Sequence, residues 1–341
     1  MKEIFLKPGL PPKGCASMKL SDSELRAFKT DGYVVARNAL NVPKDLQPVM
    51  DEYAQILARM SQRLYAAKEI SSMYSDLPFG RRAIAIARES GYLNTYPFDI
   101  NFPPYAQLTP DTELNFGPAM FGLLRNEHLL DLVESIIGPE IYSNPVQHVR
   151  VKVPEHLVPQ KKRNSQNATT GWHQDNGVVN TEADATEMLT VWFPLTEASE
   201  QHGCLKVVPR SHVEGLQLHC PHPVQGARIP MEFIPENLVV PIPMSPGDVL
   251  LMHRTCMHSS LPNKSQEIRF SLDIRYNPIG QATGRDFLPG FIARSRKNPN
   301  AELHDPEKWR QSWFAAREDL LSGNMHLPSL HRWDGSHELC A

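Results

Sequence analysis

The stretch Ile268-Arg-Phe-Ser-Leu-Asp-Ile-Arg-Tyr276 alternates apolar and polar residues. Successive side chains of a β-strand point to opposite faces, so this period of two predicts a strand with one face of each kind. The apolar face holds Ile268, Phe270, Leu272 and Ile274. The polar face holds Arg269, Ser271, Asp273 and Arg275. If the apolar face packs on helices, the polar face points into the interior of a β-barrel.

The same alternation recurs in the second half of the chain, over residues 146–153, 189–193 and 249–252. Glycine and asparagine residues separate these runs, and so do many of the 30 prolines of the chain. Residues of these types are typical of turns between short strands. Short antiparallel strands at such spacing are typical of a β-sandwich or barrel. We therefore expect residues 141–278 to form the strand core of a mainly β fold with flanking helices.

The part before this core has helical patterns. Ser21 and Glu24 can form a capping box at the start of a first helix. Apolar residues at helical spacing predict two further helices over 44–70 and 119–137. Residues 20–140 are therefore expected to be a mainly helical support for the strands.

One more helix is expected in a C-terminal extension, 279–341. It begins at Asp305 and Pro306, which suit a cap and a first turn. Its apolar stripe consists of Trp309, Trp313, Ala316 and Leu320. We expect the stripe to dock on the strand core, with a homodimer interface as the alternative. The whole chain, 1–341, then forms a single catalytic domain.

The composition is that of a globular chain without a strong electrostatic field. Hydrophobic residues make up 41% and the net charge is −3, so neither nucleic acid nor a membrane is an expected partner. No stretch reaches the roughly 20 apolar residues of a membrane helix, and the first residues lack the apolar core of a signal peptide. The five cysteines are odd in number and include no CxxC pair, which argues against a disulfide framework. We therefore expect a reducing, cytoplasmic location.

The segment Thr169-Thr-Gly-Trp-His173-Gln-Asp175-Asn-Gly177 has the pattern of a metal site. Residues i and i+2 of an extended strand share a side, so His173 and Asp175 can present an imidazole and a carboxylate to one ion. Either His253 or His258 can supply a third ligand. Two histidines and one carboxylate form the facial triad of iron(II) oxygenases, which leaves positions open for a co-substrate and O₂. A zinc hydrolase on a cupin-like barrel and an inactive ligand-binding barrel are the alternatives.

Arg269 lies eleven residues after His258, on the polar face of its strand. A guanidinium binds a carboxylate through two parallel hydrogen bonds, so Arg269 is a candidate ligand for a dicarboxylate. A structural ion pair with Asp273 on the same face explains the residue equally well.

Together these motifs resemble the phytanoyl-CoA dioxygenase family of iron(II)- and 2-oxoglutarate-dependent oxygenases. The resemblance covers roughly residues 20–278. It rests on Leu20-Ser-Asp-Ser-Glu-Leu25, Asp31-Gly32-Tyr33, Gly171-Trp-His-Gln-Asp175, Gly203-Cys-Leu-Lys-Val-Val-Pro209, Gly247-Asp248, His258-Ser-Ser260, Asn263 and Arg269. The family usually has glycine where this chain has Arg210, and the similarity weakens after about residue 280.

The resemblance implies a double-stranded β-helix, which is a jelly-roll or cupin-like fold, with Fe(2+), 2-oxoglutarate and O₂ as cofactor and co-substrates. It places the iron ligands at His173, Asp175 and His258. It assigns contacts with 2-oxoglutarate to Arg269, Ser260, Trp192, Gln174 and His148. Related halogenases lack the carboxylate ligand, so Asp175 favours hydroxylation, desaturation or cyclisation of a small organic substrate.

The substrate side is defined only in outline, and a secondary metabolite or amino-acid derivative is expected. Candidate substrate contacts lie on the inner face of residues 146–153 and after the metal-binding segment; they are Arg150, Asn176 and Asn180. The aromatic-rich segment 91–108 is either a lid over the site or a packed surface loop. Three arginines of the extension can bind an anionic substrate group or form surface ion pairs; they are Arg285, Arg294 and Arg296.

Overall fold

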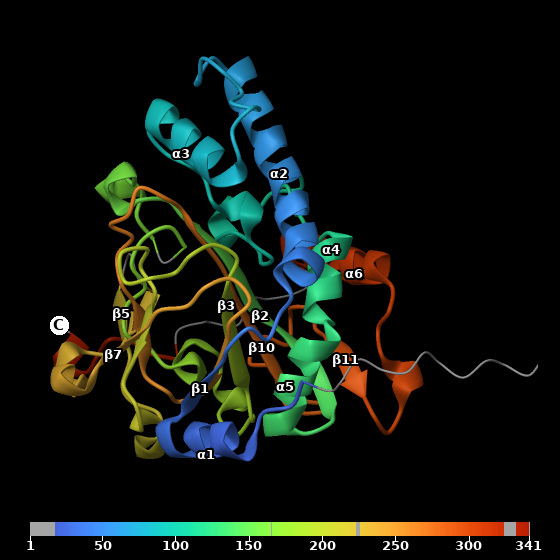
Figure 1. Ribbon diagram of the computed structural model, residues 1–341, viewed down its shortest axis with the longest axis vertical. Helices are drawn as coiled ribbons and strands as arrows, with labels where there is room; N and C mark the ends of the chain where they lie inside the picture. Colours follow the sequence, from blue (N-terminus) through green and yellow to red (C-terminus); the bar gives the residue numbers. More distant parts are fainter. Residues whose placement is uncertain (1–17, 165, 223–225, 324–331, 341) are drawn as a thin grey trace, which may run out of the picture.

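The computed structural model describes residues 18–164, 166–222, 226–323 and 332–340. Its strands form antiparallel sheets, and helices α2 to α6 lie along one side of them (Figure 1). The fold class is therefore mixed α/β with antiparallel sheets, in place of the mainly β class expected from the alternation. None of the helices in these ranges combines the length and the hydrophobicity that a bilayer span requires.

Six strands form the largest sheet, in the order β1-β8-β3-β10-β2-β11. Their bounds in that order are Tyr33–Ala36, Val249–His253, Leu189–Pro194, Arg269–Pro278, Glu140–Lys152 and Phe291–Ser295. A second sheet has the order β7-β4-β9, with bounds Val240–Ile242, Leu205–Val207 and His258–Ser260. A hairpin pairs β5, Cys220–His222, with β6, Gly226–Arg228. The strand runs expected over 146–153, 189–193, 249–252 and 268–276 are all confirmed.

The described residues include six α-helices. They are α1 (Asp22–Asp31), α2 (Gln47–Ala66), α3 (Phe79–Ser90), α4 (Pro118–Leu124), α5 (Glu127–Ile137) and α6 (Pro306–Ser322). The capping box of α1 is confirmed, because the Glu24 amide donates to the Ser21 hydroxyl and the Ser21 amide donates to the Glu24 carboxylate. The prediction of one continuous helix over 119–137 is wrong, because this range holds two helices, α4 and α5. The chain breaks at Asn126, whose side chain caps α5 by accepting a hydrogen bond from the Leu129 amide. Helix α3 has no counterpart in the sequence prediction.

Strand β10 lies at the centre of the large sheet, between β3 and β2. Asp273 pairs with Trp192 on one side and His148 on the other, so these three side chains share one face. On the opposite face, the ring of Phe270 lies 5.1 Å from that of Tyr53 in α2. The apolar face therefore packs on helices, as the alternation predicts, and the polar face lines the interior between the sheets.

The C-terminal helix α6 docks on its own chain. Trp313 stacks on Phe116 with 4.5 Å between ring centroids, and Trp309 lies edge-on to the same ring at 5.2 Å. Trp309 also reaches Phe291 of β11, at 6.4 Å. The four residues of the apolar stripe are buried. Docking on the strand core is confirmed only for the contact with β11, because other aromatic partners are Phe116, just before α4, and Phe121 within α4.

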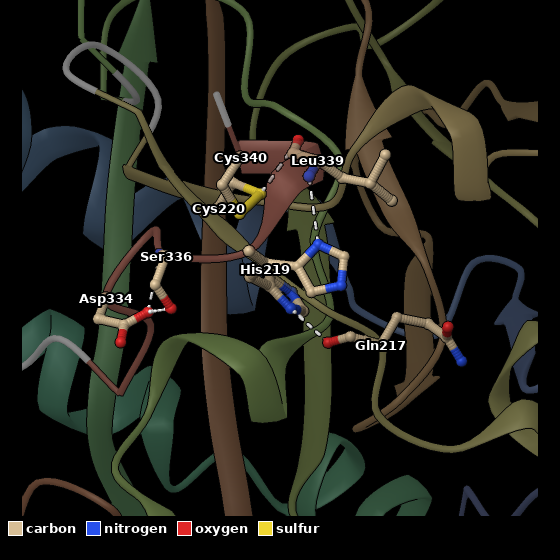
Figure 2. The surroundings of a disulfide bond; sticks show 8 residues. Gln217, His219, Cys220, Asp334, Ser336, Leu339 and Cys340 are labelled. Carbon is tan, nitrogen blue, oxygen red and sulfur yellow. Dashed lines mark hydrogen bonds between the residues drawn. A yellow bond between two sulfur atoms is a disulfide. The ribbon is translucent and has the colours of Figure 1, made fainter.

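Cys220 and Cys340 form a disulfide bond that ties the C-terminal segment to β5 (Figure 2). The expectation of no disulfide is wrong for this pair, because folding brings together two cysteines separated by 120 residues. Cys204 and Cys256 are buried free thiols, and Cys15 lies outside the described residues. The prediction of a reducing location rested on the absence of disulfides, so the Cys220–Cys340 bond removes its support.

Candidate metal centre

Three potential ligand atoms, from His173, Asp175 and His258, lie within 4.8 Å of one another. His173 and His258 face each other across a β-bridge, and each amide donates to the carbonyl of the other residue at 3.0 Å. The Nε2 atom of each histidine lies 3.9 Å from a carboxylate oxygen of Asp175. All three residues are buried, at 8%, 1% and 3% exposure. These atoms therefore form a preassembled cluster of two nitrogen ligands and one oxygen ligand.

The other candidate, His253, does not join this cluster. It ends β8, where its Nδ1 accepts a hydrogen bond from the Thr255 amide at 3.2 Å. Its ring lies 5.2 Å from that of His212 and 6.4 Å from that of Phe28, between their centroids. Of the two histidines that the sequence leaves open, the structure brings His258 to the triad.

Both triad histidines have the tautomer that a metal requires. The Nδ1 of His173 donates to the Gly171 carbonyl at 2.9 Å, and that of His258 donates to the Cys256 carbonyl at 3.0 Å. The Nε2 lone pairs are therefore free and directed at Asp175. Burial, and then the neighbouring His258, lower the pKa of His173 to about 3, so the ring is neutral at physiological pH.

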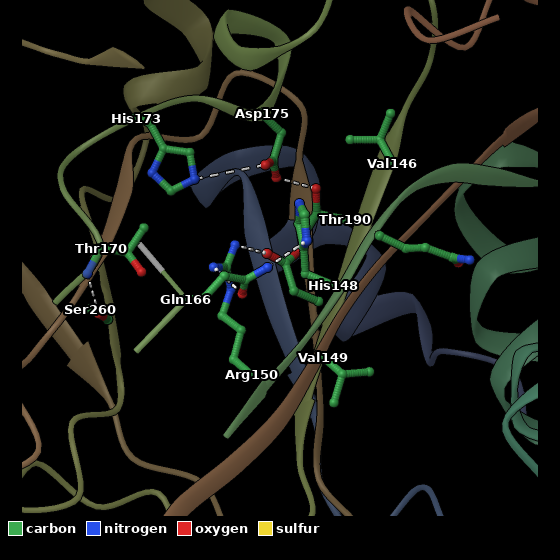
Figure 3. A network of polar contacts seen from close by, with 12 residues as sticks. Val146, His148, Val149, Arg150, Gln166, Thr170, His173, Asp175, Thr190 and Ser260 are labelled. Atoms are coloured by element: carbon green, nitrogen blue, oxygen red, sulfur yellow. Dashed lines mark hydrogen bonds and ion pairs between the residues drawn. The ribbon is translucent and has the colours of Figure 1, made fainter. Parts of the chain in front are cut away.

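Asp175 is held by two partners that the sequence analysis missed, and Figure 3 shows one of them, Thr190. Thr190 of β3 donates a hydrogen bond to one carboxylate oxygen, and Arg275 of β10 donates to the other. Burial alone would raise the pKa of Asp175, but Arg275 and the two histidines hold it well below its usual value. The strand pattern contains the signal for both, because Arg275 shares the polar face of β10 with Arg269 and pairs with Thr190.

The triad opens into a small cavity in the interior. Its lining consists of Arg150, Thr170, His173, Trp192, Leu205, Met252, His258, Ser259, Arg269 and Asp273. Three predicted site residues besides the two histidines line this cavity, namely Arg150 of β2, Trp192 of β3 and Arg269 of β10. Alternation along three strands therefore assembles this group.

Arg269 lacks a carboxylate partner within the described part of the chain. Its Nη1 donates to the Gly203 carbonyl at 2.7 Å, its guanidinium lies 5.7 Å from the centre of the Trp192 ring, and its Nε has no partner. The alternative ion pair with Asp273 does not form, because Asp273 contacts Arg150 at 3.2 Å and Arg275 at 3.4 Å. Burial, and then Arg150, lower the pKa of Arg269 to about 9. An anion in this cavity would relieve a desolvated and unpaired cation.

Lys152 lies next to the cavity residues Thr170 and Arg269, and the sequence analysis did not assign it. It pairs with Arg269 in the register, and its Nζ donates to Thr170 Oγ1 at 3.1 Å and to Ser260 Oγ at 3.3 Å. Burial, and then Arg269 and Arg150, hold its pKa well below the usual value. Ser260 therefore lies beside the cavity, with its hydroxyl also accepting the Thr170 amide at 2.9 Å.

The remaining predicted residues have other partners. Gln174 is fully buried, its amide group donates to the Gly215 and Thr255 carbonyls, and its oxygen accepts the Gln217 amide. His148 donates from Nδ1 to the Asp99 carboxylate at 2.9 Å, which leaves Nε2 for another group. Asn176 donates to the Asp184 carbonyl at 3.2 Å, and Asn180 lies in the same loop. Neither asparagine lines the cavity at the triad.

Comparisons with known proteins agree with this geometry. The model of the family "Phytanoyl-CoA dioxygenase (PhyH)" matches residues 28–271. The 1-deoxypentalenic acid 11-beta-hydroxylase of Streptomyces arenae is 32% identical over 130 residues, which cover 35% of this chain and 44% of that protein. Phytanoyl-CoA dioxygenase domain-containing protein 1 of Danio rerio is 22% identical over 266 residues, which cover 73% of this chain and 87% of that protein.

A solved structure shares the fold. The apo form of the non-heme monooxygenase ThoJ superposes with a TM-score of 0.52 at 18% sequence identity, over 87% of this chain and 97% of that chain. The match to the Streptomyces hydroxylase spans less than half of that relative's length.

Proposed function

Since the chain belongs to the phytanoyl-CoA dioxygenase (PhyH) family, we propose that it is an iron(II)- and 2-oxoglutarate-dependent oxygenase that hydroxylates a small organic substrate. The observation that carries this proposal is the unpaired Arg269 guanidinium in the same cavity as the triad. A zinc hydrolase needs no such cation beside its metal, whereas a dicarboxylate co-substrate does.

The residues present fit both the metal and the co-substrate. Two imidazoles and one carboxylate on one side of an ion match the facial triad of non-haem iron(II) oxygenases and leave its other positions open. Three arginines and Lys152 face the interior against two carboxylates, Asp175 and Asp273. This excess of positive charge, which a divalent metal increases, is complementary to the two negative charges of 2-oxoglutarate.

Loaded with iron(II) and 2-oxoglutarate, such a site uses O₂ to oxidise a substrate C–H bond and releases succinate and CO₂. The chain contributes position and charge. His173, Asp175 and His258 hold the metal, and Arg275 and Thr190 fix the carboxylate ligand. Arg269 binds the far carboxylate of the co-substrate, with Trp192 as the wall beneath its guanidinium. Ser260 and Lys152 add a hydroxyl and an ammonium donor beside it.

Hydroxylation is favoured over the related reactions. Asp175 occupies the position that a halide would need, so halogenation is disfavoured. The relative from Streptomyces arenae is named as a hydroxylase, which favours hydroxylation over desaturation or cyclisation in this chain.

We further propose that the six-stranded and three-stranded sheets are the two halves of a double-stranded β-helix in one catalytic unit. The bridge between His173 and His258 and the likeness to ThoJ support this. A homodimer through α6 stays a prediction.

The test is an anaerobic titration of the purified chain with iron(II) and then 2-oxoglutarate. We expect a metal-to-ligand charge-transfer band in the visible range that needs both components, and succinate release once O₂ and a substrate are added. A protein that retains zinc and gives no band in the presence of excess iron(II) would contradict the proposal.

A further inference from the structure

A second cavity, of about 230 Å³, lies beside the first at the bulged part of β2. Most of its lining is apolar: Phe102, Pro103, Pro104, Tyr105, Leu108, Val146, Phe287, Leu288 and Leu320. Its polar side chains are Asn101, His148 and Arg285. The volume is below the roughly 300–1,000 Å³ of sites for drug-sized ligands, so it suits a compact molecule.

This cavity adjoins the metal centre. The Val146 carbonyl in its wall accepts a hydrogen bond from Arg275 Nη1 at 2.8 Å, and Nη2 of the same guanidinium donates to Asp175. His148 forms another part of the wall and pairs with Asp273 of the inner face. Figure 3 shows Val146 and His148 on the side of Asp175 and Thr190. A molecule in the cavity therefore lies one side chain away from a metal ligand.

Among the described residues, Arg285 is the one cation that lines this cavity, and it is partly buried. Its Nη2 donates to the Val178 carbonyl at 2.7 Å, while Nε and Nη1 have no acceptor within the described residues. No carboxylate of those residues lies within 4.0 Å of its guanidinium. Burial, and then Arg275, lower the pKa of Arg285 to about 10. An unpaired cation against an apolar wall is costly, and a bound anion removes much of that cost.

We propose that this cavity binds the substrate of the proposed oxygenase, and that the substrate is a compact apolar carboxylic acid whose carboxylate pairs with Arg285. The inference rests on the proposed function. The hydrocarbon part packs on Phe102, Phe287 and Leu288, and the carboxylate pairs with the Arg285 guanidinium. A single guanidinium balances the one negative charge of a carboxylate, whereas a phosphate dianion would keep excess charge in an apolar site.

Two of the alternatives left open by the sequence bear on this site. Residues 101–105 and Leu108, within the aromatic-rich segment 91–108, form a wall of the cavity. Arg294 and Arg296, by contrast, pair with Glu134 at 3.0 Å, and Arg294 also pairs with Asp131 at 2.8 Å. Of the three arginines of the extension, Arg285 is therefore the one left for a substrate.

The experiment compares two probes of similar shape, cyclohexanecarboxylate and cyclohexylmethanol. Their binding is measured by calorimetry on the chain loaded with iron(II) and saturating 2-oxoglutarate, without O₂. We expect the carboxylate to bind about 10- to 100-fold more tightly than the alcohol, the usual range for a charge-assisted hydrogen bond. Arg285→Met should abolish this preference, and Arg285→Lys should keep part of it. The matched variant Phe287→Ala should weaken both probes and leave their ratio unchanged.

The outcomes separate the inference from the proposed function. Absence of the charge-transfer band before any probe is added contradicts the proposed function. If the band forms but the alcohol binds as tightly as the carboxylate, or Arg285→Met leaves the ratio unchanged, the inference is wrong. Tighter binding of cyclohexylphosphonate than of cyclohexanecarboxylate overturns the assignment of a carboxylate. The ratio stays informative for a destabilised variant, because a general loss of structure weakens both probes together.

Discussion

The metal centre has two walls that are built in different ways. The strand wall consists of Arg150, Trp192, Arg269 and Asp273, from β2, β3 and β10. The loop wall is our name for residues 176–185, which follow the first two ligands and adjoin the centre without lining its cavity. Backbone ladders and alternation position the strand wall. The loop wall is positioned by side-chain donors from distant segments that bind its carbonyl groups.

These donors come mainly from the C-terminal segment, 332–340. Arg332 donates to the Asn176 carbonyl at 3.0 Å and pairs with the Asp184 carboxylate at 2.7 Å. The indole of Trp333 donates to the Gly177 carbonyl at 2.7 Å. The disulfide at Cys340 fixes the same segment to β5. The contrast teaches that the strand wall depends on local periodicity, while the loop wall depends on contacts across more than 140 residues of chain, as between Asp184 and Arg332.

Asp175 stands where the two walls meet, so its removal should have the largest effect. We expect Asp175→Ala to lose iron and to lower turnover by roughly 10³-fold or more. It should also destabilise the fold by about 3 kcal/mol, since the buried Arg275 loses its nearer carboxylate and keeps only Asp273 at 3.4 Å. Iron content, succinate release and urea unfolding measure these effects. The matched control Asp184→Ala, from the same loop, should keep iron; retained iron in Asp175→Ala itself would refute the ligand assignment.

Breaking the disulfide should affect the loop wall alone. We expect Cys340→Ser to lower the free energy of unfolding by about 2–4 kcal/mol, because the bond closes a loop of 120 residues in the unfolded chain. Urea unfolding with and without a reductant measures this. The reductant should destabilise the wild type and leave the variant unchanged. Iron affinity should change little, and a large loss of iron would show that the two walls are coupled.

Changing Arg269 should affect the strand wall alone. We expect Arg269→Met to raise the dissociation constant of 2-oxoglutarate about 10- to 100-fold, by loss of a charge-assisted hydrogen bond in a buried site. Anaerobic titration of the charge-transfer band measures the affinity. Iron binding before the co-substrate is added serves as the control and should be unchanged. Arg269→Lys should recover part of the affinity, and an unaltered dissociation constant in Arg269→Met would place the co-substrate elsewhere.

The same contrast explains what the sequence could predict. Alternation over 268–276 predicts the polar face of β10, and the spacing of His173 and Asp175 predicts two ligands. The sequence pattern does not reveal that three backbone groups bind the side-chain amide of Gln174, which lies between those ligands. It gives no sign of the Cys220–Cys340 bond or of Trp333 on the loop, because such contacts depend on where the chain returns in space. The break of the helix at Asn126 was missed for a local reason, since the apolar stripe continues through the cap.

A change at His253 has the smallest expected effect. It distinguishes this histidine, at the end of β8, from the proposed ligand His258 five residues later. Burial, and then His212 and Arg254, lower its pKa to about 4, compared with about 6.5 when unfolded. Between these values the unfolded chain binds more protons, so the stability contributed by neutral His253 is present above pH 6.5 and lost as the pH falls toward 4. The loss should be about 1–2 kcal/mol, since the ring is partly exposed and screened.

We expect His253→Gln to flatten the pH dependence of urea unfolding over this range and to keep iron, whereas His258→Gln should lose iron. Loss of iron in His253→Gln, with retention in His258→Gln, would reverse the choice between the two histidines.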